Sequence, residues 1–160
     1  MPDLTDKIMA NIESRLTRVE ERPEPNFVVI CDGGSLDNQV AKLGYGSYMI
    51  EIPGRQFRSA IKKVDYGPGV SNNEAEYMIA IDALKVLEDI ILAEGGLCNQ
   101  YVIEIKTDSQ LVIGHMSKGW KLNAKNLEAH YNGLKHQMEK FKAVIFAKMP
   151  DTWIKEVLGH

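Results

Sequence analysis

Two apolar, β-branched segments that each end in an aspartate constrain the fold of this chain most strongly. One ends at Asp32 and the other at Asp108, and a long helical pattern over residues 72–94 lies between them. Such segments are typical of strands in an α/β sheet, and open α/β sheets hold their active sites beyond the carboxyl ends of the strands. We therefore expect Asp32 and Asp108 to lie near each other. Glu76 stands in the first turns of the helical pattern and would join them if that helix packs on both strands.

Asp32, Glu76 and Asp108 would repel one another in a shared site, and a divalent cation relieves such repulsion. A site built from carboxylates alone favours Mg²⁺ or Mn²⁺ over zinc, because these hard ions prefer oxygen ligands. The alternative is that each acid is a solvated residue at a strand end or at a helix start. The presence of all these segments in this order favours the metal site.

The resemblance to a known family lies in three motifs: Asp32-Gly33-Gly34-Ser35, Asn72-Asn73-x-x-Glu76-Tyr77 and Thr107-Asp108-Ser109-Gln110-Leu111-Val112. In order and spacing they resemble the signature of type 1 ribonuclease H, from Asn26 to the C-terminus. The resemblance implies an endonuclease that hydrolyses the RNA strand of RNA–DNA hybrids. It also implies two bound metal ions, Mg²⁺ or Mn²⁺, held by Asp32, Glu76, Asp108 and a fourth ligand.

The chemistry of phosphodiester hydrolysis explains why carboxylates are needed. In two-metal catalysis the ions lie about 3.5–4 Å apart; one lowers the pKa of the attacking water and the other stabilises the leaving 3′-oxygen. Asp32, on the central first strand, is the best candidate to bridge the ions, and Glu76 and Asp108 would bind one ion each. No Ser-His-Asp or Cys-His nucleophile pattern is evident, and this reaction requires none.

The fourth ligand is where the sequence departs from the family pattern. The family places an aspartate within the final helix, and no aspartate occupies that place here. His160 lies near the expected position, and a neutral imidazole binds Mn²⁺ well and Mg²⁺ poorly. Glu156, one helical turn earlier, and Asp151, at the start of the segment, are the alternatives. His160 is predicted to be a metal ligand or a proton shuttle, rather than a frayed terminal residue.

Substrate contacts are predicted from weaker signals. We expect exposed backbone N–H groups near the metals at Gly33, Gly34 and Ser35. We expect side-chain amides that reach 2′-hydroxyls in a shallow minor groove at Asn72, Asn73 and Gln110. Ser71 or Asn72 would also cap the long helix, and Glu74 is expected to be solvated. Trp120 and Lys121 lie in a lysine-rich stretch that would hold phosphates and a deoxyribose of the DNA strand, unless Trp120 turns into the core.

The remaining periodicity predicts a mixed five-stranded sheet flanked by helices, an α/β architecture that the resemblance also implies. Strands are expected over residues 27–32, 43–52, 56–64, 101–107 and 142–148, and helices over residues 72–94, 109–117, 124–140 and a short final segment. Residues 26–160 are therefore interpreted as one ribonuclease H-like domain.

Residues 1–25 form a separate N-terminal segment in this interpretation. Apolar residues recur there at helical spacing among charged ones, at Leu4, Ile8, Ile12, Leu16 and Val19. Pro23 and Pro25 then end this amphipathic helix, because proline cannot continue a helix. The helix would pack on the body of the same subunit or form the contact of a homodimer.

The composition agrees with a single small enzyme. The chain has 160 residues, of which 44% are hydrophobic and 26% charged, and this balance excludes a disordered chain. It has two cysteines, no signal-like N-terminus and no apolar run of about 18 residues, so we expect a cytoplasmic protein without membrane contact. The net charge of −3 argues against holding nucleic acid by bulk electrostatics alone. The second hypothesis is a catalytically weak nucleic-acid-binding module on the same fold, dimeric through the N-terminal helix.

Overall fold

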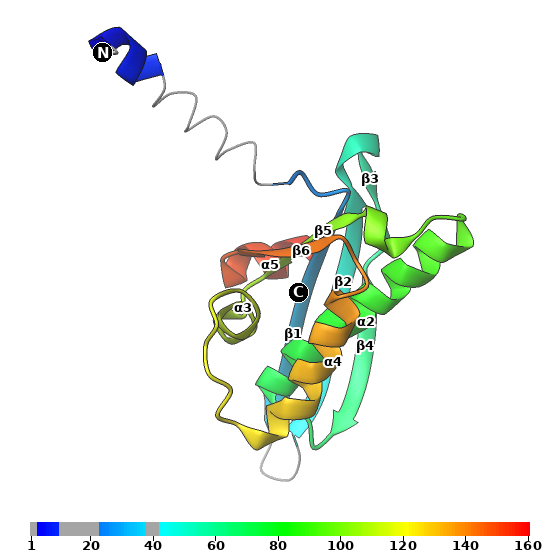
Figure 1. Ribbon diagram of the computed structural model, residues 1–160. Coiled ribbons are helices and arrows are strands. Elements are labelled where there is room, and N and C mark those ends of the chain that lie inside the picture. Colours follow the sequence, from blue (N-terminus) through cyan, green and yellow to red (C-terminus); the bar gives the residue numbers. More distant parts are fainter. Residues whose placement is uncertain (1–2, 10–22, 38–41) are drawn as a thin grey trace.

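The computed structural model describes residues 3–9, 23–37 and 42–160 (Figure 1). Its centre is a mixed sheet in which β1 (Phe27–Asp37) pairs antiparallel with β2 (Lys42–Ile52) and parallel with β5 (Val102–Thr107). β6 (Ala143–Lys148) pairs parallel with β5 and forms one edge of the sheet. This arrangement confirms the predicted mixed sheet and places β1 between its antiparallel and parallel halves.

The third predicted strand is divided into two pieces that both pair with β2. β3 (Phe57–Arg58) and β4 (Lys62–Pro68) follow each other along the same edge, so six strands occupy the five expected sheet positions. The interruption lies at Ser59, whose N–H donates to Ile50 O at 2.7 Å while its side-chain Oγ accepts from Ile50 N at 2.9 Å. Because a side-chain oxygen replaces a backbone acceptor, the ladder breaks there without leaving Ile50 N unpaired.

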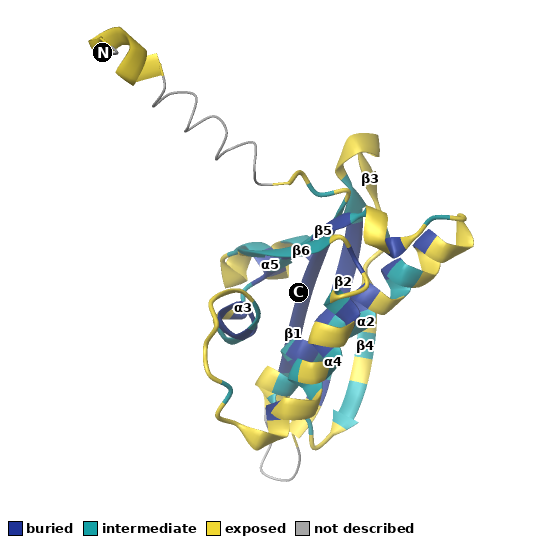
Figure 2. Cartoon of the chain, in the orientation of Figure 1, coloured by how far each residue is buried: buried dark blue, intermediate teal, exposed yellow. Residues whose placement is uncertain are grey.

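Helices cover both faces of the sheet. They are α2 (Asn72–Ala93), α3 (Gln110–Ser117), α4 (Glu128–Met138) and α5 (Asp151–Val157), with short 3-10 turns η1 (Pro53–Arg55), η2 (Cys98–Gln100) and η3 (Lys125–Leu127). Alternate residues of β1 separate two cores. Val29 and Cys31 pack with α2 and α4, whereas Val28 and Ile30 pack with Ile154 of α5 and its neighbours. Figure 2 shows β1 and the inner face of α2 as the main buried layer.

The described part of the N-terminal segment includes a helix over residues 4–9. Leu4, Ile8 and Met9 are exposed on it, so these side chains do not pack on the body of the subunit. The predicted stripe continues at Ile12 and Leu16, and this part of the prediction lies outside the described residues. Among the described helices, none is long and apolar enough to cross a membrane.

Candidate active site

Asp32 lies in β1 opposite Ser47 of β2, and its side chain is only 7% exposed. Burial raises the pKa of Asp32 above its ordinary value. The charges of His160 and Lys155 oppose this rise, and the charge of Asp151 adds to it. The C-terminal helix and the residues after it therefore act electrostatically on the carboxylate of the first strand.

Glu76 is brought to Asp32 by a close approach of α2 to β1. A Cβ atom on Gly33 would lie 2.4 Å from the carbonyl carbon of Ala75 and 2.6 Å from the backbone nitrogen of Glu76, so only glycine permits this contact. The Oγ of Ser109 donates a hydrogen bond to Oε2 of Glu76 at 2.7 Å. Burial raises the pKa of Glu76 to about 7 against this hydrogen bond, and the charges of Asp108 and Asp32 add to the rise.

Asp108 directly follows β5, as the sequence predicts, and has a buried oxygen, Oδ1, with no hydrogen-bond partner among the described residues. Burial raises the pKa of Asp108 to about 6, with contributions from the neighbouring Asp151 and from Asp32. A buried, unpartnered carboxylate oxygen is costly unless a cation occupies the space beside it.

Asp151, one of the two alternatives to His160 as the fourth ligand, lies next to Asp108. The loop after β6 is only Met149 and Pro150, so α5 begins at Asp151, beside the end of β5. The carboxyl group of Asp108 interacts with that of Asp151 and lowers its pKa, and Lys155 Nζ, 3.2 Å from Asp151 Oδ2, lowers it further. Asp151 is therefore a candidate for the fourth acid, whose absence was the reason for the binding-module alternative.

His160 reaches the same area by a reversal of the chain after α5. The N–H of His160 donates to Lys155 O at 2.7 Å, the N–H of Gly159 donates to Glu156 O at 3.3 Å, and Gly159 has a φ of +74°. These features define a Schellman motif. The reversal places Nε2 of His160 2.6 Å from Oγ of Ser47, beside Asp32, and Figure 1 shows the C-terminus over the sheet near β1. Glu156 has an exposed side chain and no longer shares a helical face with His160.

The chemistry of the side chains at the site fits a hard divalent cation. Within residues 3–9, 23–37 and 42–160, no three His, Cys, Asp or Glu side chains form a group that could hold a metal ion as they stand. The oxygens available at the site come from Asp32, Glu76, Asp108 and Asp151, and Oδ1 of Asp108 already lacks a protein partner. Carboxylate oxygens of this kind suit Mg²⁺ or Mn²⁺.

Several predicted substrate residues lie together beside the carboxylates. A groove of about 260 Å³ is lined by Ser35, Lys42, Ser71, Asn72 and Asn73. Ser71 is the N-cap of α2, with its Oγ accepting from Glu74 N at 3.2 Å, which leaves the exposed side chains of Asn72 and Asn73 available to a ligand. The sequence analysis missed Lys42, a lone lysine beside residues whose placement is not described.

The glycines of the first motif differ from the expectation. Gly33 and Gly34 are buried, Gly33 against α2 and Gly34 beneath the ring of Tyr45, so they do not present exposed N–H groups. Gln110 is exposed at the start of α3, where Ser109 is the N-cap. Ser109 was also missed as a residue of the site, although it lies within the motif around Asp108.

Trp120 and Lys121 lie in the chain between α3 and α4. Trp120 packs against Gly114 on one side and remains 41% exposed, with Lys118 Nζ 5.8 Å from the ring centroid. The ring is thus neither fully in the core nor free, and Lys121 is exposed beside it. Glu74, expected to be solvated, instead bonds with His130 of α4.

Comparison with known proteins agrees with this architecture. The N-terminal RNase H domain of Rv2228c from Mycobacterium tuberculosis is 22% identical, with 81% of this chain and 90% of that one covered and a TM-score of 0.64. RNase H1 from the halophilic archaeon Halobacterium salinarum is 21% identical over 82% and 92%, with a TM-score of 0.65. LC11-RNase H1, solved in complex with an RNA/DNA hybrid, is 19% identical over 81% and 89%, with a TM-score of 0.66.

These structural similarities show the fold, and the sequence comparison shows the family. A search among curated proteins finds no match. The sequence model of the RNase H family, however, matches residues 24–160. This range agrees with the extent of the resemblance that the motifs predicted. Because the match covers the whole chain after the N-terminal segment, this protein belongs to the ribonuclease H family of enzymes.

Proposed function

We propose that this protein hydrolyses the RNA strand of RNA–DNA hybrids with two divalent ions, Mg²⁺ or Mn²⁺, bound by Asp32, Glu76, Asp108 and Asp151. The observation that carries the proposal is the buried Oδ1 of Asp108, which has no partner among the described residues. Burial, and after it the neighbouring acids Asp151 and Asp32, raise the pKa of this carboxyl group. When bound, the ions would activate the attacking water and stabilise the leaving 3′-oxygen.

Neighbouring residues hold the proposed metal ligands in place. Ser109 holds Glu76 through a 2.7 Å hydrogen bond, and the close packing at Gly33 fixes the start of α2 against β1. Asp32 and Glu76 are thereby presented from a rigid strand and a long helix. Such pre-organisation reduces the movement that the ligands need when the ions bind.

His160 is proposed as a proton shuttle rather than as a metal ligand. Its Nε2 already interacts with Ser47 Oγ at 2.6 Å, and Asp151 supplies the fourth carboxylate. A neutral imidazole can accept a proton at one nitrogen and donate at the other, which suits transfer between the leaving group and solvent.

The substrate assignment follows from the groups around the carboxylates. Asn72, Asn73 and Gln110 are exposed amides that can bond 2′-hydroxyls, which only the RNA strand carries. Trp120 and Lys121 are proposed to hold the sugar and phosphates of the DNA strand. In support, LC11-RNase H1 has been solved with an RNA/DNA hybrid bound.

The proposal is tested by cleavage of a labelled RNA–DNA hybrid beside RNA–RNA and DNA–DNA duplexes, with Mg²⁺ and Mn²⁺ in turn. We expect the RNA strand of the hybrid alone to be cut, and only with a metal present. Asp32→Asn and Asp108→Asn should abolish cleavage while leaving hybrid binding intact or tighter, because each removes a ligand and a negative charge near phosphate. Near-normal turnover in either variant would refute the site.

A further inference from the structure

A buried pair of polar rings joins α2 to α3. The hydroxyl of Tyr77 lies 2.5 Å from Nδ1 of His115, and the two rings stack with centroids 6.1 Å apart and planes at 21°. Tyr77 is fully buried and His115 is 7% exposed, so water does not readily replace either partner. Neither side chain takes part in the proposed hydrolysis. Burying two polar groups costs desolvation free energy, which their hydrogen bond has to offset.

The same two helices are joined a second time, at the proposed ligand Glu76. Glu76 is the residue before Tyr77 on α2, and Ser109, the N-cap of α3, donates to its Oε2 at 2.7 Å. His115 lies in the last turn of α3, so the two bonds lie near the opposite ends of this short helix. One hydrogen bond lets a helix turn about it, whereas two bonds near its two ends fix both its distance and its direction.

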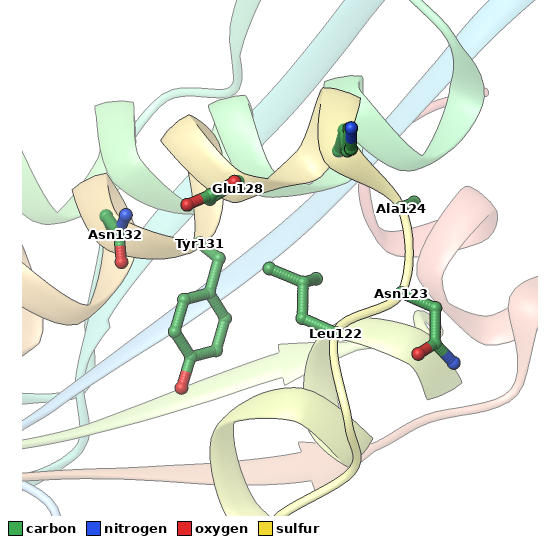
Figure 3. Close-up of a pocket in the computed structure, with 7 residues that line it drawn as sticks. Leu122, Asn123, Ala124, Glu128, Tyr131 and Asn132 are labelled. Atoms are coloured by element: carbon green, nitrogen blue, oxygen red, sulfur yellow. The ribbon is translucent and has the colours of Figure 1, made fainter.

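α4 also contacts the His115 ring. Tyr131 meets it edge-on, with ring centroids 6.3 Å apart and planes at 80°. Tyr131 itself lines a pocket of about 360 Å³ together with Leu122 and Asn123 (Figure 3), so its ring is not enclosed on all sides. Packing from α4 therefore supports His115, but the bond to Tyr77 is what directs the imidazole toward α2.

We propose that His115 is a positioning residue: through its bond to Tyr77 it fixes α3 against α2, so that Ser109 holds Glu76 in place for a divalent ion. This inference rests on the proposed function, in which Glu76 binds metal. Loss of a group that bonds directly to a ligand, as Ser109 does, typically costs about 10- to 100-fold in metal affinity. His115 acts one step further from the ligand, so its contribution is smaller.

The test compares two variants that each remove a tyrosine hydroxyl bonded at α2. Tyr77→Phe removes the bond to His115. Tyr66→Phe is the matched control, because the hydroxyl of Tyr66 on β4 donates to Oδ2 of Asp82 on α2, also at 2.5 Å. Mn²⁺ binding to the hybrid-free protein is measured by titration calorimetry. Tm in a chelating buffer and KM for the hybrid at saturating Mn²⁺ are measured beside it.

We expect Tyr77→Phe to raise the dissociation constant for Mn²⁺ by about 3- to 10-fold, below the range for a direct partner of a ligand, with KM nearly unchanged. Tyr66→Phe should leave Mn²⁺ binding unchanged even if it lowers Tm equally. His115→Asn, whose side-chain amide can take the place of Nδ1, should keep Mn²⁺ binding near that of the wild type. In a Ser109→Gly background, where glycine is still tolerated as an N-cap, the effect of Tyr77→Phe should shrink, because both changes act on Glu76 through α3.

Equal Mn²⁺ dissociation constants for Tyr77→Phe and Tyr66→Phe, or a raised KM with unchanged Mn²⁺ binding, would overturn the inference while leaving the proposed function in place. If Tyr77→Phe does not fold, its combination with His115→Leu removes both polar partners without leaving one unpaired, and the Mn²⁺ binding of that double variant decides in the same way. A wild-type protein that binds no Mn²⁺ would overturn the proposed function, and the inference with it.

Discussion

The carboxylates of the site are buried close to one another, and a bound cation would reduce the repulsion between their negative charges. Burial raises the pKa of Glu76 to about 7 and that of Asp108 to about 6, above the values of the same groups in an unfolded chain. Between about pH 4 and 7 the folded protein therefore binds more protons than the unfolded chain, so its free energy of unfolding falls as the pH rises. Above about pH 7 this loss of stability is complete.

Asp108→Asn should therefore stabilise the metal-free protein at pH 8. The amide carries no charge to repel Glu76 and Asp32, and the expected rise in Tm is roughly 2–5 °C, as about 1 kcal/mol gives in a domain of this size. Thermal unfolding in a chelating buffer at pH 5 and pH 8 measures it, and the gain should be smaller at pH 5. Added Mg²⁺ should stabilise the wild type at pH 8 more than the variant. A variant less stable than the wild type at pH 8 would contradict the repulsion.

Gly33→Ala should damage the site through the backbone. The added Cβ would lie 2.4 Å from the Ala75 carbonyl, so α2 must move and carry Glu76 with it. We expect a loss of about 1–3 kcal/mol in stability, typical of overpacking, and a fall in cleavage of about 100-fold from misplacement of Glu76. Gly54→Ala is the control, because a Cβ on Gly54 would meet nothing within 4 Å. Equal activities of the two variants would contradict this role of Gly33.

The elements that carry the site could be predicted from sequence to different degrees. The structure places Glu76 in the first turns of α2 and Asp108 directly after β5, as the patterns predicted. The predicted strand end at Asp32 is wrong, because β1 continues to Asp37 in its pairing with β2, and Asp32 lies within the strand just beyond its parallel pairing with β5. The sequence left Asp151 as an alternative to His160, because the choice depends on how the loop of two residues after β6 places the start of α5. Local patterns predict the type of an element well, but they do not predict where a short connection delivers the next one.

The reversal after α5 is a second feature that periodicity could not reveal. Extending the helix to the C-terminus places His160 above Glu156, whereas the Schellman turn at Gly159 redirects it to Ser47. The signal was present, because a glycine next to the last residue is typical of a helix C-terminus. The chain thus brings its C-terminal residue to the carboxylates by an ordinary end of a helix.

His160→Ala should reduce turnover by about 10- to 1,000-fold, as expected for loss of a general acid–base group. The protein should stay folded, because His160 is exposed and α5 is held by Ile154 and Leu158 in the core. Imidazole added to the buffer should partly restore activity, which a purely structural residue would not allow. Glu156→Ala, an exposed change on α5, serves as control and should retain wild-type turnover. Unchanged turnover in His160→Ala would contradict the role of His160 as a proton shuttle and would mean that water transfers the proton.

We propose that the N-terminal segment, residues 1–25, is separate from the ribonuclease H-like domain that follows it. The candidate acids all lie in β1, α2, α5 and the residue after β5, within the range that matches the family. The sheet also has all of its strands without the N-terminal helix, whose described apolar side chains are exposed. Removal of residues 1–23 should therefore leave the fold and the chemistry intact.

A chain that starts at Glu24 should cleave the hybrid within about 3-fold of the full-length rate, since it keeps every proposed ligand and Asn26. Asn26 pairs with β5, its N–H donating to Val102 O and its Oδ1 accepting from Val102 N, both at 2.8 Å. A chain that starts at Val28 loses both bonds and should lose about 1–3 kcal/mol of stability. If the chain from Glu24 folds but no longer cleaves, the N-terminal helix contributes to the substrate path or to an obligatory dimer. Sedimentation of the full-length chain and of the chain from Glu24 separates these cases, because loss of a dimer contact halves the mass of the particle and loss of a substrate contact does not.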